Sequence, residues 1–127
     1  MPQFKKFLLL GIVFAALSVL FGAFGAHGLK NMALDANSIN NFETAARYQF
    51  YHALGLILIF LLSHHTLKLS LLNLAGWLMT AGTLLFSGSL YLYVLTGIKA
   101  IAMITPVGGL LMIVSWIFLF MAALKGR

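Results

Sequence analysis

Four long apolar segments are the feature that most constrains how this chain folds. A helix rises about 1.5 Å per residue, so roughly 20 residues cross a hydrocarbon core about 30 Å thick. Apolar residue types make up 62% of the sequence and charged types only 8%, too few charges to cover a surface in water. The sequence therefore predicts an all-α protein, a four-helix transmembrane bundle forming one domain over 1–127. The expected spans are about 7–26, 45–64, 69–95 and 105–124.

Capping signals mark where these helices should begin and end. Gly28 follows the first apolar segment and is suited to a left-handed cap. Asn40 with Glu43 three residues later is a capping-box variant, which predicts that the second helix begins near Asn41. Thr105-Pro106 fits an N-cap followed by the first helical position of the fourth helix.

The connections and the positive charges predict the topology. The stretch 64–68 is short, so the second and third helices should be antiparallel neighbours. The apolar stretch 97–104 should lie in the membrane interface or fold back on the bundle. Lys and Arg concentrate on the cytoplasmic side, which predicts a multi-pass protein of the cell (inner or plasma) membrane with both termini cytoplasmic. The side of the termini carries Lys5, Lys6, Lys68, Lys125 and Arg127, and the other side Lys30, Arg47 and Lys99.

Composition and missing motifs exclude several function classes. The net charge is +6, but the basic residues lie scattered at segment ends, so we expect no nucleic-acid binding. The chain has no cysteine, which removes thiolate chemistry and Cys-ligated metals. The only acids are Asp35 and Glu43, and no catalytic triad, phosphate loop or carboxylate pair is found. We expect membrane lipids as partners, no cofactor and no metal, and the sequence favours a non-enzymatic protein.

Small residues recur along one face of the first segment, from Gly11 to Ala26, and of the third, from Gly76 to Ser87. Such faces let helix backbones approach closely. We interpret them as helix-packing faces, either within the bundle or in a homo-oligomer, with a substrate path as the alternative. The aromatics Trp77 and Trp116 are expected to be interfacial-belt or packing residues.

Polar residues gather near the connection between the first two segments and are the candidate ligand-binding residues. His27 ends the first segment, and His52 is expected about one turn inside the second, at similar depth in the same leaflet. Ionisable residues inside a span are functional suspects because charging them there is costly. The candidates are His27, Lys30, Glu43, Arg47, Tyr48, Tyr51, His52, Ser87 and Ser89.

Helical rotation divides these candidates between two faces. At about 100° per residue, Arg47 and His52 differ by about 140° and cannot face one pocket on a straight helix. Glu43 and Arg47 share the first face. The simplest interpretation is an interfacial ion pair that anchors the start of the helix, and the alternative is recognition of an anionic headgroup or substrate by Arg47, Lys30 and the nearby helix start.

Tyr48 and His52 share the other face. The simplest interpretation is a neutral His52 hydrogen-bonded to Tyr48, His27 or a serine such as Ser87 or Ser89. The alternatives are metal or haem ligation by His27 with His52, or a proton relay.

Four stretches resemble a known family of small membrane proteins, the domain of unknown function 423 family. They are FGAFGAHGLK at 21–30, NFETAARYQFYHAL at 41–54, SGSLY at 87–91 and ITPVGG at 104–109. The resemblance covers essentially the whole chain. It implies a four-span inner-membrane protein and supplies no reaction, substrate or catalytic residue.

Three functions remain open at the level of sequence. The first is a structural or accessory bundle that binds lipid or a small amphiphile at the polar cluster. The second is a subunit of an oligomeric small-solute transporter or channel, since four helices alone enclose too narrow a path. The third is a haem or quinone redox protein.

Overall fold

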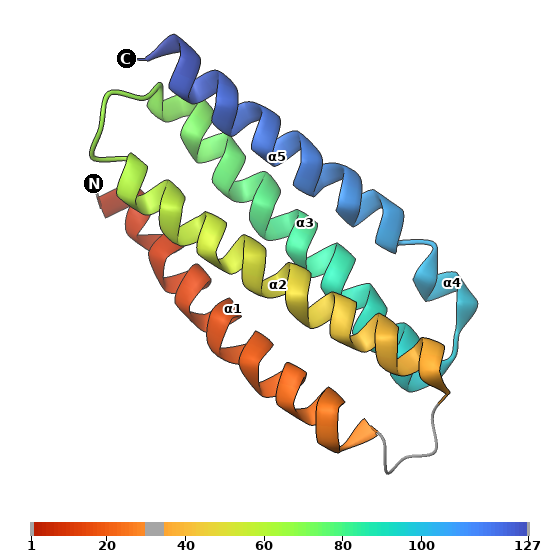
Figure 1. Ribbon diagram of the computed structural model, residues 1–127. Coiled ribbons are helices and arrows are strands. Elements are labelled where there is room, and N and C mark those ends of the chain that lie inside the picture. The colour runs from red at the N-terminus through yellow and green to blue at the C-terminus, as the bar shows by residue number, and fades with distance from the viewer. Residues whose placement is uncertain (1, 30–34, 127) are drawn as a thin grey trace.

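The computed structural model describes residues 2–29 and 35–126, and within these ranges the protein is entirely helical (Figure 1). Three long helices, α1, α2 and α3, and the stretch Lys99–Lys125 are each long and apolar enough to cross a membrane. This confirms the predicted all-α fold with four helices of membrane-spanning length. The helices are α1 (Pro2–His27), α2 (Ala36–Leu62), α3 (Leu69–Thr96), α4 (Lys99–Ala102) and α5 (Thr105–Lys125).

The first half of α2 differs from the prediction. The helix begins at Ala36, because Asp35 is its N-cap and accepts a hydrogen bond from the Ser38 backbone N–H at 2.7 Å. This bond also lowers the pKa of the exposed Asp35 carboxyl from its usual 3.8. The predicted start near Asn41 was therefore wrong, and every polar residue of α2 lies deeper in the helix than expected.

Two other capping predictions need correction. Gly28 does not adopt a left-handed conformation; its N–H continues the helical pattern to the Phe24 carbonyl at 2.6 Å. The left-handed cap belongs to Gly97, with φ 73°, at the end of α3. At the start of α5, Ile104 is the N-cap and Thr105 the first helical residue, one position from the prediction.

The long helices follow one another across the molecule (Figure 1). α2 and α3 pack together in the middle, α1 packs mainly on α2, and α5 packs on α3. The first helix and the last share no extensive contact among the described residues. We call the end of the bundle with both termini the terminal end, and the end with the α1–α2 connection and α4 the loop end (Figure 1). The predicted fold-back of 97–104 is seen as the contact of α4 with α3.

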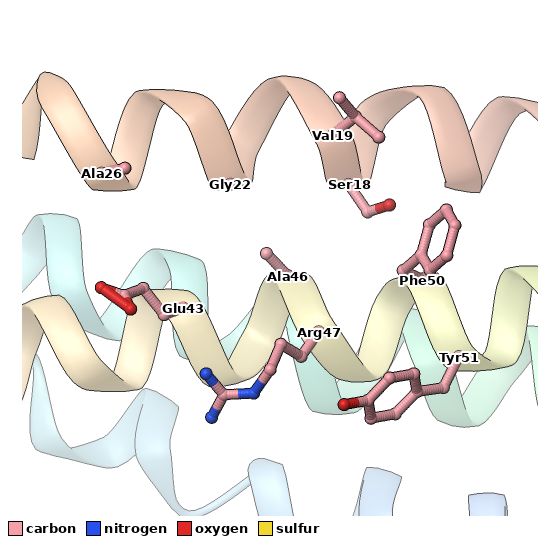
Figure 2. Close-up of a pocket in the computed structure, with 9 residues that line it drawn as sticks. All are labelled: Ser18, Val19, Gly22, Ala26, Glu43, Ala46, Arg47, Phe50 and Tyr51. Carbon is pink, nitrogen blue, oxygen red and sulfur yellow. The ribbon is translucent and has the colours of Figure 1, made fainter.

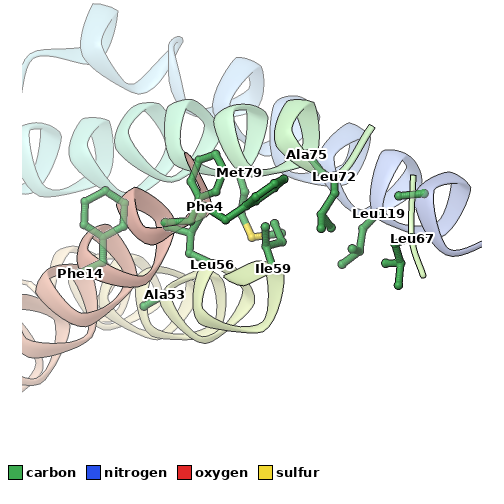
Figure 3. Packing of buried hydrophobic residues seen from close by; sticks show 12 residues of the cluster. Phe4, Phe14, Ala53, Leu56, Ile59, Leu67, Leu72, Ala75, Met79 and Leu119 are labelled. Carbon is green, nitrogen blue, oxygen red and sulfur yellow. The ribbon is translucent and has the colours of Figure 1, made fainter. Parts of the chain in front are cut away.

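Two apolar clusters hold the helices together. The larger lies toward the terminal end and takes side chains from all four long helices (Figure 3). Its members include Phe4, Phe7, Leu56, Ile59, Leu72, Met79 and Leu119. The smaller lies at the loop end, where the tilted rings of Phe42 and Tyr91 pack with centroids 4.8 Å apart beside Leu29 and Val94.

Small residues form the helix contacts, as the packing interpretation predicted. A Cβ added at Gly11 would lie 2.7 Å from the backbone oxygen of Ala53 on α2. One added at Gly108 on α5 would collide with the backbone of Phe86 on α3. These glycines therefore set how closely the helices approach within one chain. Association with a second copy through such faces stays a prediction.

Candidate functional site

A groove of about 400 Å³ opens on the side of the bundle between α1 and α2 (Figure 2). The α1 side is made of small or apolar residues. The α2 side adds a carboxylate, a guanidinium and two aromatic rings, so the groove combines an apolar floor with a charged rim. Its lining residues are Ser18, Val19, Gly22, Ala26, Glu43, Ala46, Arg47, Phe50 and Tyr51.

The groove exists because α1 and α2 separate between two points of close contact. At Gly11 a Cβ would lie 2.7 Å from the Ala53 oxygen, so the backbones touch there. At Gly22 an added Cβ would meet only the Cβ of Ala46, at 3.9 Å. Farther along α1, the Phe42 ring fills the space between the helices, 3.0 Å from the position of a Cβ on Gly25. The space between these contacts is open to the surroundings of the bundle.

Arg47 does not form the expected ion pair with Glu43. Its guanidinium donates a hydrogen bond to the Thr44 hydroxyl oxygen at 3.1 Å, and its side chain is exposed. No ion pair to Glu43 is found among the described residues. In Figure 2 the carboxylate and the guanidinium end at separate places, the guanidinium on the side of α2 away from α1 in this view. The four-residue spacing allows an ion pair between Glu43 and Arg47, but the guanidinium bonds to the Thr44 hydroxyl instead.

The position of Arg47 along α2 suits a residue that extends toward a membrane surface. It stands 15 residues before Leu62, about 22 Å from that end of the helix. With Leu62 at one face of a core about 30 Å thick, the backbone of Arg47 lies inside the opposite leaflet. The side chain reaches toward the start of α2 (Figure 2), as long cationic side chains do when they extend to headgroups.

His52 is fully hydrogen-bonded within the chain. Its Nδ1 lies 2.8 Å from the Tyr48 carbonyl oxygen, and its Nε2 accepts a hydrogen bond from the Trp116 indole N–H at 3.0 Å. Because Nε2 accepts, Nδ1 carries the proton and the imidazole is neutral. The predicted contact with Tyr48 is present, through its backbone. The second partner is Trp116 of α5, which had been expected in a belt or packing role.

His27 and His52 do not lie at similar depth, contrary to prediction. Gly11 faces Ala53, so His52 is level with the first half of α1, whereas His27 is exposed at the far end of that helix. His52 stands about 15 Å from Leu62, near the middle of a 30 Å core. Ligation of one haem or metal by this pair is therefore wrong. The described residues contain no group of three His, Cys, Asp or Glu that could hold a metal.

The two serines bond to other helices and not to His52. The Ser87 hydroxyl donates to the Ala45 carbonyl oxygen at 2.8 Å, which ties α3 to α2. The Ser89 hydroxyl contacts the Thr105 hydroxyl at the start of α5 and donates to the Phe86 carbonyl at 3.0 Å. Both belong to helix packing near the loop end.

Gln49 is the polar residue that sequence reasoning missed. It is buried, donates through Nε2 to the Phe14 carbonyl of α1 at 2.8 Å, and accepts from the Tyr91 hydroxyl of α3 at 2.7 Å. One side chain thus joins three helices. The signal was available, since an amide in an apolar segment needs partners. Its partners could not be named, because they lie 35 and 42 residues away.

The structure separates the candidate residues as the rotation argument predicted. Glu43, Arg47 and Tyr51 line the α1–α2 groove. Tyr48 and His52 line a second pocket of about 440 Å³ between α2 and α5. Lys30 lies outside the described residues.

Comparison with known proteins places the chain in a family. A family model described as a protein of unknown function (DUF423) matches residues 21–109. The chain belongs to this family. The match covers the residues that line the α1–α2 groove except Ser18 and Val19, reaches the start of α5, and confirms the resemblance seen in the sequence.

Curated relatives of this DUF423 chain are named as membrane proteins. It is 46% identical over 121 residues to the UPF0382 membrane protein SAB0533 of Staphylococcus aureus (strain bovine RF122 / ET3-1), covering 95% of this chain and 97% of the relative. It is 44% identical over 121 residues to the UPF0382 membrane protein YwdK of Bacillus subtilis (strain 168), covering 95% and 98%. No solved structure matches. The names and the four long apolar helices together identify an integral membrane protein.

Proposed function

We propose that this DUF423 protein is a non-enzymatic membrane bundle that binds a phosphate-bearing amphiphile in the α1–α2 groove. The observation that carries the proposal is the Arg47 guanidinium, which lines the groove and makes one hydrogen bond, to Thr44. A guanidinium has five N–H donors and matches the geometry of phosphate oxygens. Most of its donors are thus available to an anionic headgroup.

The rest of the groove suits an alkyl chain. Val19 and Gly22 of α1 and Phe50 of α2 present apolar surface between Arg47 and mid-depth. An amphiphile placed with its phosphate at Arg47 would lay its chain along this surface. The position of Arg47 along α2 fits this placement, since its guanidinium reaches toward the headgroup region while the groove continues into the hydrocarbon.

Native mass spectrometry of protein extracted from vesicles of equal phosphatidylethanolamine and phosphatidylglycerol tests the proposal. We expect wild-type protein to retain phospholipid, and both Arg47→Ala and the groove-filling Gly22→Leu to lose most of it. Lys99→Ala removes an exposed cation from α4 and serves as the control, with Gly22→Ala as the control for folding. Equal retention by wild type, Arg47→Ala and Gly22→Leu would overturn the proposal.

We also propose antiparallel neighbours with both termini on the cytoplasmic side of the cell (inner or plasma) membrane. Support comes from the eight Lys and Arg, five of which lie on the side of the termini. The chain has no native cysteine, so Asp35→Cys gives a single thiol at the start of α2. We expect a membrane-impermeant maleimide to label it in intact cells. Labelling only after lysis contradicts this topology.

The alternative is a subunit of an oligomeric small-solute transporter or channel. It has less support, because the buried polar side chains of Gln49 and His52 are hydrogen-bonded within the chain. Solute flux in proteoliposomes that disappears in His52→Ala, with the bundle still folded, would favour the alternative.

A further inference from the structure

The rim of the α1–α2 groove carries two opposite charges that do not neutralise each other. Glu43 and Arg47 stand one helical turn apart and both line the groove. Yet Arg47 bonds to Thr44, and neither charge has an ion-pair partner among the described residues. Figure 2 shows the two charged groups projecting from α2 at different places.

Unpaired charges at the edge of a hydrocarbon core interact strongly with any complementary charge that reaches them, because the surroundings screen them poorly. A purely anionic headgroup would satisfy Arg47 and leave Glu43 facing a like charge. A headgroup that bears both an anion and a cation would satisfy both residues.

The cation must also be a hydrogen-bond donor. Glu43 is half-buried, and a carboxylate there accepts hydrogen bonds best from an ammonium with N–H groups. A trimethylammonium has no N–H to donate and offers only cation–π contact with a ring such as Tyr51. The charge pattern therefore distinguishes among phospholipids that share the same phosphate.

Building on the proposed function, we propose that the groove selects an aminophospholipid. The lipid phosphate bonds to Arg47, its primary ammonium bonds to Glu43, and its acyl chain lies against Val19 and Gly22. Phosphatidylethanolamine has this chemistry. Phosphatidylglycerol lacks the cation, and phosphatidylcholine lacks the N–H donors.

Competition in nanodiscs tests this assignment. Protein in discs of equal phosphatidylethanolamine, phosphatidylglycerol and phosphatidylcholine is released and its retained lipids are counted by native mass spectrometry. We expect wild type to prefer phosphatidylethanolamine by about tenfold, the effect of one charge-assisted hydrogen bond. Glu43→Gln should lose the preference and still retain phospholipid, whereas Arg47→Gln should lose retention. Asp35→Asn, a change of the other acid in the chain, should behave as wild type.

The outcomes separate this inference from the proposed function. Equal retention of all three lipids by wild type, or a preference that survives in Glu43→Gln, overturns the aminophospholipid assignment while Arg47-dependent binding stands. Retention that is unchanged in Arg47→Gln overturns both. Free phosphoethanolamine should not displace the lipid, because it lacks the acyl chain; displacement overturns the assignment to a lipid.

Discussion

His52 lies near mid-depth of an apolar bundle, and both of its ring nitrogens are hydrogen-bonded. A polar group in hydrocarbon has no water to bond, so its stability depends on partners within the protein. Trp116 supplies one of them from α5, and the pair is a polar link between α2 and the last helix. We expect the pair to contribute to the stability of the bundle.

Replacing Trp116 tests this role. We expect Trp116→Phe to lower the free energy of unfolding by about 1 kcal/mol, because Nε2 of His52 loses its donor while the aromatic bulk stays. Unfolding by sodium dodecyl sulfate in mixed micelles measures the change. Trp77→Phe is the matched control, since Trp77 is 45% exposed against 39% for Trp116 and its indole has no hydrogen-bond partner among the described residues. Equal losses in the two variants would mean that aromatic packing, and not the hydrogen bond, explains the effect.

Only one of the two hydrogen-bond partners of His52 could be predicted from the sequence. The four-residue spacing places the Tyr48 carbonyl beside the ring of any helical His52, so that contact was predictable. Trp116 is 64 residues away, and an apolar helix gives no rotational signal for which side faces a neighbour. The partners of Gln49 were unpredictable for the same reason, since they too lie on other helices.

At the scale of helices, the separation of α1 from α2 decides where a groove can form. Gly11 brings the two backbones together, and beyond it the spacing widens until Phe42 closes the gap. The positions of Gly11 on α1 and Phe42 on α2 therefore decide where the groove between the two helices lies.

Two alanine substitutions should reveal the difference between the close helix contact at Gly11 and the wider spacing at Gly22. Gly11→Ala should destabilise the protein by about 1–3 kcal/mol, because its Cβ would press on the backbone oxygen of Ala53. Gly22→Ala should cause no loss, because its Cβ meets only Ala46 at ordinary contact distance. Thermal unfolding in detergent compares them. A Gly11→Ala variant as stable as wild type would show that the backbones can separate at little cost.

The lengths of the helices were only partly predictable. Hydropathy located the four segments because the bilayer sets their length. It could not locate the start of α2, since four of the six residues from Ala36 to Asn41 are polar, although Ile39 packs against the smaller cluster. The cap at Asp35 uses a contact to Ser38 that competes with the capping box at Asn40 in the sequence.

At the scale of the whole molecule, the central pair α2 and α3 carries α1 on one side and α5 on the other. Hydropathy predicts four helices, but not that the first and last share no extensive contact among the residues that the structure describes. The order of the helices depends on which helix faces made of small residues pack against each other.

A cysteine pair tests this arrangement. The chain has no cysteine, so Gly22→Cys with Ala46→Cys introduces two thiols whose Cβ atoms would be 3.9 Å apart, within the range of a disulfide. We expect an oxidant to cross-link α1 to α2 within one chain. Gly22→Cys with Ile113→Cys, which joins α1 to the exposed side of α5, should not cross-link within a chain. Efficient cross-linking of the second pair would contradict the described order of helices.

The polar contacts also bear on how the bundle assembles after synthesis. Ser18, the buried polar residue of α1, bonds to the Ala15 carbonyl of its own helix, so α1 is satisfied when alone in lipid. Gln49 of α2 needs Phe14 from the helix before it and Tyr91 from the helix after it. Gln49 therefore enters the bilayer with an incomplete set of partners and gains Tyr91 only when the third helix arrives. The Gln49 amide thus links insertion of the second helix to its docking on the first helix and on the third.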